Sequence, residues 1–64
     1  MSNPNECYYN GGMWDGRWMS TNHHALQMFA KRSIYADKKT IIHRYERVSA
    51  NEMQFKEEVI EPMI

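Results

Sequence analysis

The residues with the greatest potential for metal binding are one cysteine and three histidines, Cys7, His23, His24 and His43. A zinc site needs three or four such ligands that converge on one point, and this spacing matches no known arrangement. His23 and His24 are adjacent, so on a helix their side chains would point about 100° apart and could not easily hold one ion together. We therefore expect no metal and no other cofactor, and interpret the histidines as capping or solvent-facing residues.

Catalysis is not predicted either. Cys7 and a histidine could form a nucleophile and base pair, but no glycine-rich nucleophile turn or phosphate-binding loop accompanies them. Glu57 and Glu58 are adjacent, so in a strand their carboxylates would point to opposite faces and could not act as a paired acid and base. We expect a protein that is not an enzyme and that works by binding another macromolecule.

The candidate binding residues begin with a dense aromatic group. Tyr8, Tyr9, Trp14 and Trp18 fall within eleven residues, and Arg17 lies among them. Tryptophan, tyrosine and arginine dominate the binding energy of protein interfaces, so these five residues are predicted to contact a partner. The alternative is structural, because aromatic side chains also stabilise a hairpin by stacking across its strands.

The charges are balanced in number and uneven in distribution. Eight acidic residues match eight basic ones, yet the basic residues concentrate in residues 31–48 and the acidic ones in residues 49–64. We expect the two segments to be neighbouring strands whose charges pair, in preference to a polarised binding face. Four lysines and arginines near the middle of the chain complete the predicted partner-binding set: Lys31, Arg32, Lys38 and Lys39.

Residues 7–20 are predicted to form a β-hairpin. Asp15-Gly16 is typical of a two-residue type I′ turn in which both residues take positive φ. In that register Trp14 pairs with Arg17 and Trp18 with Met13, so one tryptophan faces the core and the other faces solvent. The sequence does not say which.

A helix is predicted from about residue 23 to residue 35. Ser20, Thr21 and Asn22 are candidate N-caps. Hydrophobic residues then recur at the spacing of one helical face, namely Leu26, Phe29, Ala30 and Ile34. This face is expected to pack on a sheet.

Residues 40–48 alternate and predict a strand, whereas the next segment has two interpretations. Ser49-Ala50-Asn51-Glu52 matches a helical capping box, but residues 52–59 also alternate as a strand does. We prefer a hairpin with Asn51 in the left-handed conformation. It pairs Val48 with Glu52, Tyr45 with Phe55, His43 with Glu57 and Ile41 with Val59. The expected fold is α+β, with ββαββ order and one helix on one face of a small antiparallel sheet.

We expect one domain at residues 7–61, preceded by a flexible arm at 1–6 and followed by a tail at 62–64. A single cysteine cannot form an internal disulfide, which favours a reducing cytoplasm. The apolar runs, such as Ile41-Ile42, are too short to cross a bilayer, and no basic-then-apolar signal pattern is present. Membrane insertion and export are therefore not expected.

The order of a short hairpin, a helix containing Ala25 and Ala30, and the alternating strand 41–48 resembles compact α/β proteins that bacteriophages make against host machinery. These include some anti-CRISPR proteins and phage inhibitors of host RNA polymerase. The resemblance covers residues 7–59 and is architectural, so no binding residue is carried over from it. It implies an inhibitor that blocks the surface of a host protein or nucleoprotein complex in the bacterial cytoplasm. Many such proteins are acidic, and the neutral charge of this one does not fit mimicry of DNA.

Our leading hypothesis is therefore a protein-binding inhibitor or adaptor. One alternative is a small nucleic-acid-binding accessory protein that uses the basic segment 31–47. Another is a subunit that completes its core by forming a homodimer through an outer sheet face.

Overall fold

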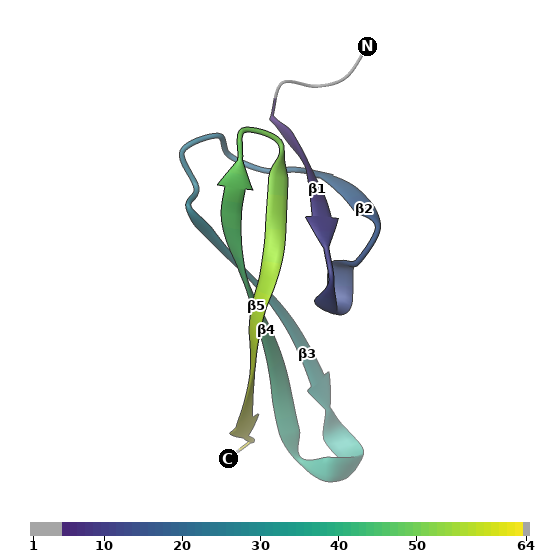
Figure 1. Cartoon of the computed structure of the whole chain (residues 1–64). Coiled ribbons are helices and arrows are strands. Elements are labelled where there is room, and N and C mark those ends of the chain that lie inside the picture. Colours follow the sequence, from purple (N-terminus) through teal and green to yellow (C-terminus); the bar gives the residue numbers. More distant parts are fainter. Residues whose placement is uncertain (1–4, 64) are drawn as a thin grey trace.

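The computed structural model describes residues 5–63, and its main element is one five-stranded sheet. The strands are β1 (Glu6–Asn10), β2 (Arg17–Ser20), β3 (Gln27–Ile34), β4 (Lys39–Ser49) and β5 (Glu52–Pro62). Two single 3₁₀ turns, η1 (Gly12–Trp14) and η2 (Tyr35–Asp37), lie between strands. The strand order is β2-β1-β5-β4-β3, and the sheet curls into an open half-barrel (Figure 1).

Two antiparallel units make up the sheet. β3, β4 and β5 follow one another as a meander, and β1 and β2 form a hairpin. The units join where β1 runs parallel to the start of β5, with Tyr9 beside Met53. The flexible N-terminal segment predicted at residues 1–6 lies mostly outside the described residues, although Glu6 already belongs to β1. Pro62 is the last residue of β5, so the predicted tail begins inside a strand.

The predicted α+β fold is wrong, because residues 27–34 form strand β3 and no helix packs on the sheet among residues 5–63. All eight residues of β3 pair with β4, from Gln27 opposite Glu46 to Ile34 opposite Lys39. The proposed helical face is therefore divided between the two sides of a strand. Only Ala30 is buried, whereas the side chain of Leu26 is 72% exposed and that of Phe29 is 52% exposed.

The predicted helix cap is a local turn. The Asn22 side-chain oxygen accepts a hydrogen bond from the His24 backbone N–H at 2.8 Å, and the Ala25 N–H donates to the Asn22 carbonyl at 2.9 Å. Asparagine makes the same side-chain contact in an isolated turn as at a helix N-terminus. Asn22 therefore makes a contact of the capping type, but the helix that it was predicted to cap is absent from residues 27–34.

The first hairpin is present, but its predicted two-residue turn is wrong. Tyr8 pairs with Trp18 and Tyr9 with Arg17, so the connection spans η1 as well as Asp15 and Gly16. Asp15 has a φ of −50°, and its carboxylate accepts the Gly11 N–H at 2.7 Å across the loop. The loop is closed by this side chain instead of by a tight turn.

The second hairpin is confirmed: residues 52–62 form a strand, and Tyr45 lies opposite Phe55. A β-bulge between Arg44 and Tyr45 then shifts the predicted register by one residue. His43 faces Glu58 and Ile41 faces Ile60, while Val59 moves to the other side of the sheet beside Ile42. At the turn, Ser49 and not Val48 lies opposite Glu52. The only described residue with positive φ, glycines apart, is Lys38, so Asn51 is not left-handed.

The core lies at one end of the molecule, between β1, η1 and the adjoining parts of β3, β4 and β5 (Figure 1). Its buried residues are Cys7, Tyr9, Ala30, Tyr45 and Met53. The other half of the meander extends past this core, which gives the molecule dimensions of 42 × 19 × 17 Å. We call this extension the arm and define it as residues 29–34, 39–43 and 57–62, within which Ala30, at the inner end, still belongs to the core. In the described chain β1 pairs with β5 only as far as Gln54, so both outer strands of the arm have an open edge.

Gly12 allows η1 to contact β4, and this makes a testable prediction. A Cβ atom at Gly12 would lie 2.6 Å from the Tyr45 hydroxyl oxygen and 2.8 Å from the Phe55 ring, and the φ of Gly12 is +67°. Gly12→Ala should lower the free energy of unfolding by about 2–5 kcal/mol, measured by urea denaturation, because overpacking adds to backbone strain. Gly16→Ala is the matched control, since Gly16 has a φ of +80° with no atom within 4 Å, and should cost only about 1–2 kcal/mol. Equal losses from both variants would contradict the close contact.

Candidate functional site

Trp14 and Trp18, both predicted to bind a partner, have different surroundings. Trp14 stacks on Tyr45, with ring centroids 5.4 Å apart and planes within 13°, and meets Tyr9 edge-on. Trp18 lies on the outer side of the hairpin against Tyr8, and its side chain is 59% exposed. One tryptophan is thus inside and one outside, as expected, although the register that led to this expectation was wrong. Tyr9 is fully buried and cannot contact a partner.

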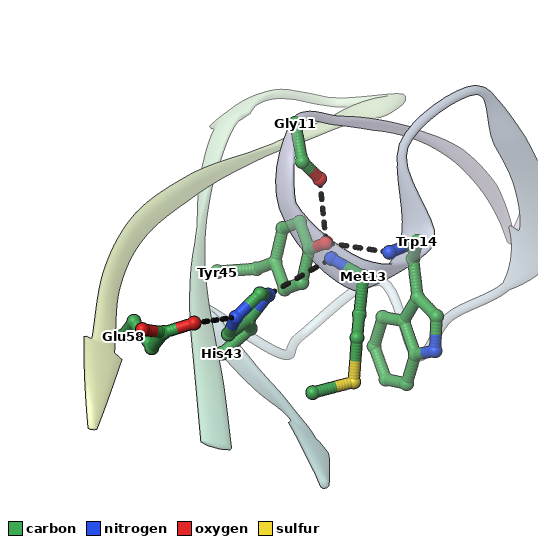
Figure 2. A network of polar contacts seen from close by, with 6 residues as sticks. All are labelled: Gly11, Met13, Trp14, His43, Tyr45 and Glu58. Carbon is green, nitrogen blue, oxygen red and sulfur yellow. Dashed lines mark hydrogen bonds and ion pairs between the residues drawn. The ribbon is translucent and has the colours of Figure 1, made fainter. Parts of the chain in front are cut away.

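A hydrogen-bond network connects η1 to β4 (Figure 2). The Tyr45 hydroxyl donates to the Gly11 carbonyl at 2.6 Å and accepts the Trp14 N–H at 2.8 Å. Next to it, His43 Nδ1 accepts the Met13 N–H at 2.9 Å, and His43 Nε2 lies 2.8 Å from the Glu58 carboxylate. An Nδ1 that accepts carries no proton, which assigns the proton of the neutral ring to Nε2. The sequence analysis missed this network, because its residues are about thirty positions apart.

The two buried tyrosines are structural groups. Burial raises the pKa of Tyr45 and of Tyr9 above the ordinary value of 10.0. Both phenols therefore stay protonated around neutral pH and available as hydrogen-bond donors. Tyr9 shares a hydrogen bond of 2.6 Å with the hydroxyl of Thr21, which is itself buried.

Arg47 is used inside the fold. Its guanidinium donates to the carbonyls of Ala25 at 2.8 Å, Asn22 at 2.9 Å and Ala50 at 2.7 Å. It also lies 3.4 Å from the sulfur of Cys7, a buried free thiol. Arg47 thus joins the loop before β3 to the β4–β5 turn and is not available to a partner.

Arg44 is occupied as well, by carboxylates on its own strand and on the next. It pairs with Glu57 at 2.8 Å and with Glu46, and the hydrogen bond from Arg44 lowers the pKa of Glu46. The pair of Arg44 with Glu57 and the contact of His43 with Glu58 confirm that the basic and acidic segments are neighbouring strands whose side chains interact. Exposed pairs of this kind add little to stability, typically about 0–1 kcal/mol.

The remaining predicted binding residues lie at opposite edges of the sheet. Arg17 and Trp18 are on β2 at one edge, whereas Lys31 and Arg32 are exposed on β3 at the other. Lys38 is exposed after η2, and Lys39 is half-buried at 3.9 Å from Asp37. The structure does not bring the aromatic and basic residues together into one surface.

A surface that the sequence analysis did not predict lies on the outer face of the arm. Phe29, Ile42 and Val59 come from three adjacent strands and surround a hollow of about 460 Å³. Lys31 and Glu61 border the same hollow. We call these five residues the outer arm face. Its signal in the sequence was the pair of adjacent β-branched residues at 41–42, since neighbours in a strand must point to opposite sides.

Within residues 5–63, no group of three or more His, Cys, Asp or Glu side chains is placed to hold a metal ion. The described part of the chain also has no helix that is long and apolar enough to cross a membrane.

Comparison with known proteins gives no relative: no family model, no curated protein and no solved structure matches this chain. The resemblance to phage inhibitors therefore stays a prediction, and the structure of residues 5–63 lacks the helix on which it partly relied.

Because the two tryptophans are buried to different extents, replacing each by alanine should lower the free energy of unfolding by different amounts. Trp14→Ala should lower the free energy of unfolding by about 3–5 kcal/mol, because it leaves a cavity between Tyr9 and Tyr45. Trp18→Ala should cost about 1 kcal/mol, the scale of one exposed aromatic pair with Tyr8. Urea denaturation measures both, and a loss from Trp18→Ala as large as that from Trp14→Ala would show that the outer pair also supports the fold.

The buried tyrosines predict a loss of stability in alkali. Their pKa values are raised in the folded protein, so unfolding releases protons once the pH exceeds about 10. Stability from these groups is complete below that pH and falls above it, by up to about 1.4 kcal/mol per pH unit for each tyrosine. Denaturation at pH 8–11 should show this fall, and Tyr9→Phe should reduce its slope. Tyr35→Phe is the control because Tyr35 is 77% exposed, and an equal effect of the two variants would be evidence against the burial argument.

Proposed function

We propose that this protein acts by binding another protein through its arm. The observation that carries the proposal is that the arm has apolar side chains on both faces, and no other described segment covers them. The outer arm face contributes Phe29, Ile42 and Val59, of which Phe29 is 52% exposed and Val59 is 40% exposed. On the other face Ile60 is 54% exposed and lies opposite Ile41.

The pattern of the strands supports this proposal. An antiparallel sheet with one face in water shows alternating apolar and polar residues, whereas strands with contiguous apolar residues are typical of sheets covered on both faces. In the arm, Ile41-Ile42 on β4 lie directly opposite Ile60 and Val59 on β5. Covering one such side chain completely contributes about 1.5–3 kcal/mol, so a partner that covers several could bind with useful affinity.

The open edges of the arm supply a second means of binding. The outer edge of β3 and the edge of β5 beyond Gln54 have no strand beside them among residues 5–63. Backbone N–H and C=O groups at such edges can pair with an added strand of a partner. Lys31 and Arg32 on β3 place positive charge at one edge, which protects it from unspecific pairing and favours an acidic partner segment.

A nucleic-acid partner has less support. Of the basic segment 31–47, Arg44 is paired with carboxylates and Arg47 with backbone carbonyls. The exposed Lys31, Arg32 and Lys38 share this end of the molecule with Glu58 and Glu61 of β5, whose charges would repel phosphates, while Glu57 is paired with Arg44.

The proposal predicts where the protein contacts its partner in cells. A photocrosslinking amino acid placed at Val59 or at Ile60 should give specific protein adducts after irradiation, identified by mass spectrometry. Val48 is the matched control, because it is also a valine, is similarly exposed at 47%, and lies at the other end of β4. Adducts from Val48 or Trp18 without adducts from the arm would place the binding surface elsewhere and refute the proposal.

A further inference from the structure

We propose that the outer arm face binds a second copy of this chain, packed face to face about a two-fold axis that runs parallel to β4. The inference rests on the proposed function and goes further by naming the partner of one face. It is argued from the register of the three strands and from the positions of two charges.

The register places the outward-facing residues of the arm in three neighbouring rows, the first of which holds Phe29 on β3, Arg44 on β4 and Glu57 on β5. Lys31, Ile42 and Val59 form the second row from β3 through β4 to β5. The next row on the same face ends with Glu61 on β5. β4 is central, so a two-fold axis along it exchanges the two flanking strands between copies. β3 of each copy then lies over β5 of the other, and the same patch serves both copies.

The charges select this axis. Lys31 lies on the β3 flank and Glu61 on the β5 flank, and neither forms an ion pair within residues 5–63. When the flanks are exchanged, Lys31 of each copy lies over the row that holds Val59 of the other, one row from the unpaired Glu61 and one row from Glu57, which Arg44 already pairs. The flexible lysine side chain can reach that carboxylate. An axis perpendicular to the strands would instead place each Lys31 near its own equivalent, where like charges repel.

The apolar residues fit the same arrangement. Ile42 lies on the central strand and meets its equivalent at the axis, as does Arg44, whose charge is neutralised by Glu46 and Glu57. The apolar stems of Glu57 and Lys31 of the other copy lie over Phe29 and Val59. Sheets that pack face to face lie about 10 Å apart and interdigitate their side chains, and the hollow of about 460 Å³ gives room for this.

The size of the face sets the expected strength. Three strands about 4.8 Å apart and six residues long present an area of roughly 14 Å by roughly 20 Å. Two such faces bury roughly 560 Å² in total, less than half of what stable interfaces bury, so the dimer is weak and monomer and dimer exchange reversibly. The dimer is therefore expected to form at high protein concentration and to be sensitive to single charge changes.

Sedimentation velocity from 10 µM to 1 mM tests the inference. The wild-type protein should dimerise within this range. Lys31→Glu alone and Glu61→Lys alone should each weaken dimerisation at least tenfold, because each homodimer would contain two like-charged contacts. An equimolar mixture of the two variants should restore the dimer, since every contact then joins opposite charges, and so should the double variant K31E/E61K.

Arg17→Glu makes the same change in charge as Lys31→Glu at the far edge of the sheet and should leave dimerisation unchanged. A wild-type protein that stays monomeric at 1 mM overturns the inference. The proposed function would survive that result if Val59 and Ile60 still crosslink to another protein, and would fail with it if they do not. Dimerisation that the mixture does not restore, or that Arg17→Glu weakens equally, also overturns the inference, because the dimer would then use another surface. Recovery in the mixture shows in addition that both variants are folded.

Discussion

The hydroxyl of Tyr45 connects the two units of the sheet. The side chain is fully buried, and its oxygen both donates to Gly11 and accepts from Trp14, so a polar group inside the core is satisfied by the backbone of η1 (Figure 2). An unpaired buried hydroxyl would instead cost about 1–3 kcal/mol. Its ring meanwhile stacks on Trp14 and meets Tyr9, which places β4 against the β1–β2 hairpin. The close approach requires that residue 12 have no side chain.

Arg47 has a corresponding role at the other side of the core. Its guanidinium holds the carbonyls of Asn22 and Ala25 beside the β4–β5 turn, and the Leu26 carbonyl accepts the Arg47 backbone N–H at 2.9 Å. These contacts hold the loop after β2 beside the free edge of β4. Strand β3 then begins at Gln27 and pairs with β4. The planar guanidinium of arginine has five N–H donors in fixed directions and can hold several carbonyls at once, whereas the ammonium group of lysine cannot hold them in this geometry.

These two contacts explain which parts of the fold were predictable from sequence. Local patterns correctly identified the β1–β2 hairpin, β4, β5 and the pairing of Tyr45 with Phe55. The spacing of Leu26, Phe29, Ala30 and Ile34 predicted a helix, but the open edge of β4 provides eight residues of pairing that a helix cannot use. Helical propensity is a weak preference and tertiary pairing overrides it. The bulge beside Tyr45 was not foreseen either, since it adds one residue to β5 between Phe55 and Glu57 and the alternation of the sequence continues across it.

The same reasoning applies to the candidate site. The alternation of side chains along a strand predicted that one tryptophan would be exposed. The distribution of charge predicted that the basic and acidic segments would be neighbouring strands. The use of Arg44 and Arg47 inside the fold was not predicted, because nothing local distinguishes them from Lys31 and Arg32. The outer arm face was not predicted, because the expected register placed Val59 on the same face of the sheet as Tyr45. The bulge instead places Val59 on the opposite face, beside Ile42.

Because the core lies at one end of the molecule, the apolar side chains of the arm other than Ala30 are not fully buried. Only five hydrophobic residues of the described chain are buried, and all belong to the end where η1 and β1 approach β4 and β5. A curled sheet covers its own concave side only where strands from its two units face each other. In the arm a single unit of three strands remains, so Ile42, Val59 and Ile60 gain no full burial from the described chain. Because apolar surface of this kind is stabilised chiefly by removal from water, a sheet that is longer than its core supports the association that we propose.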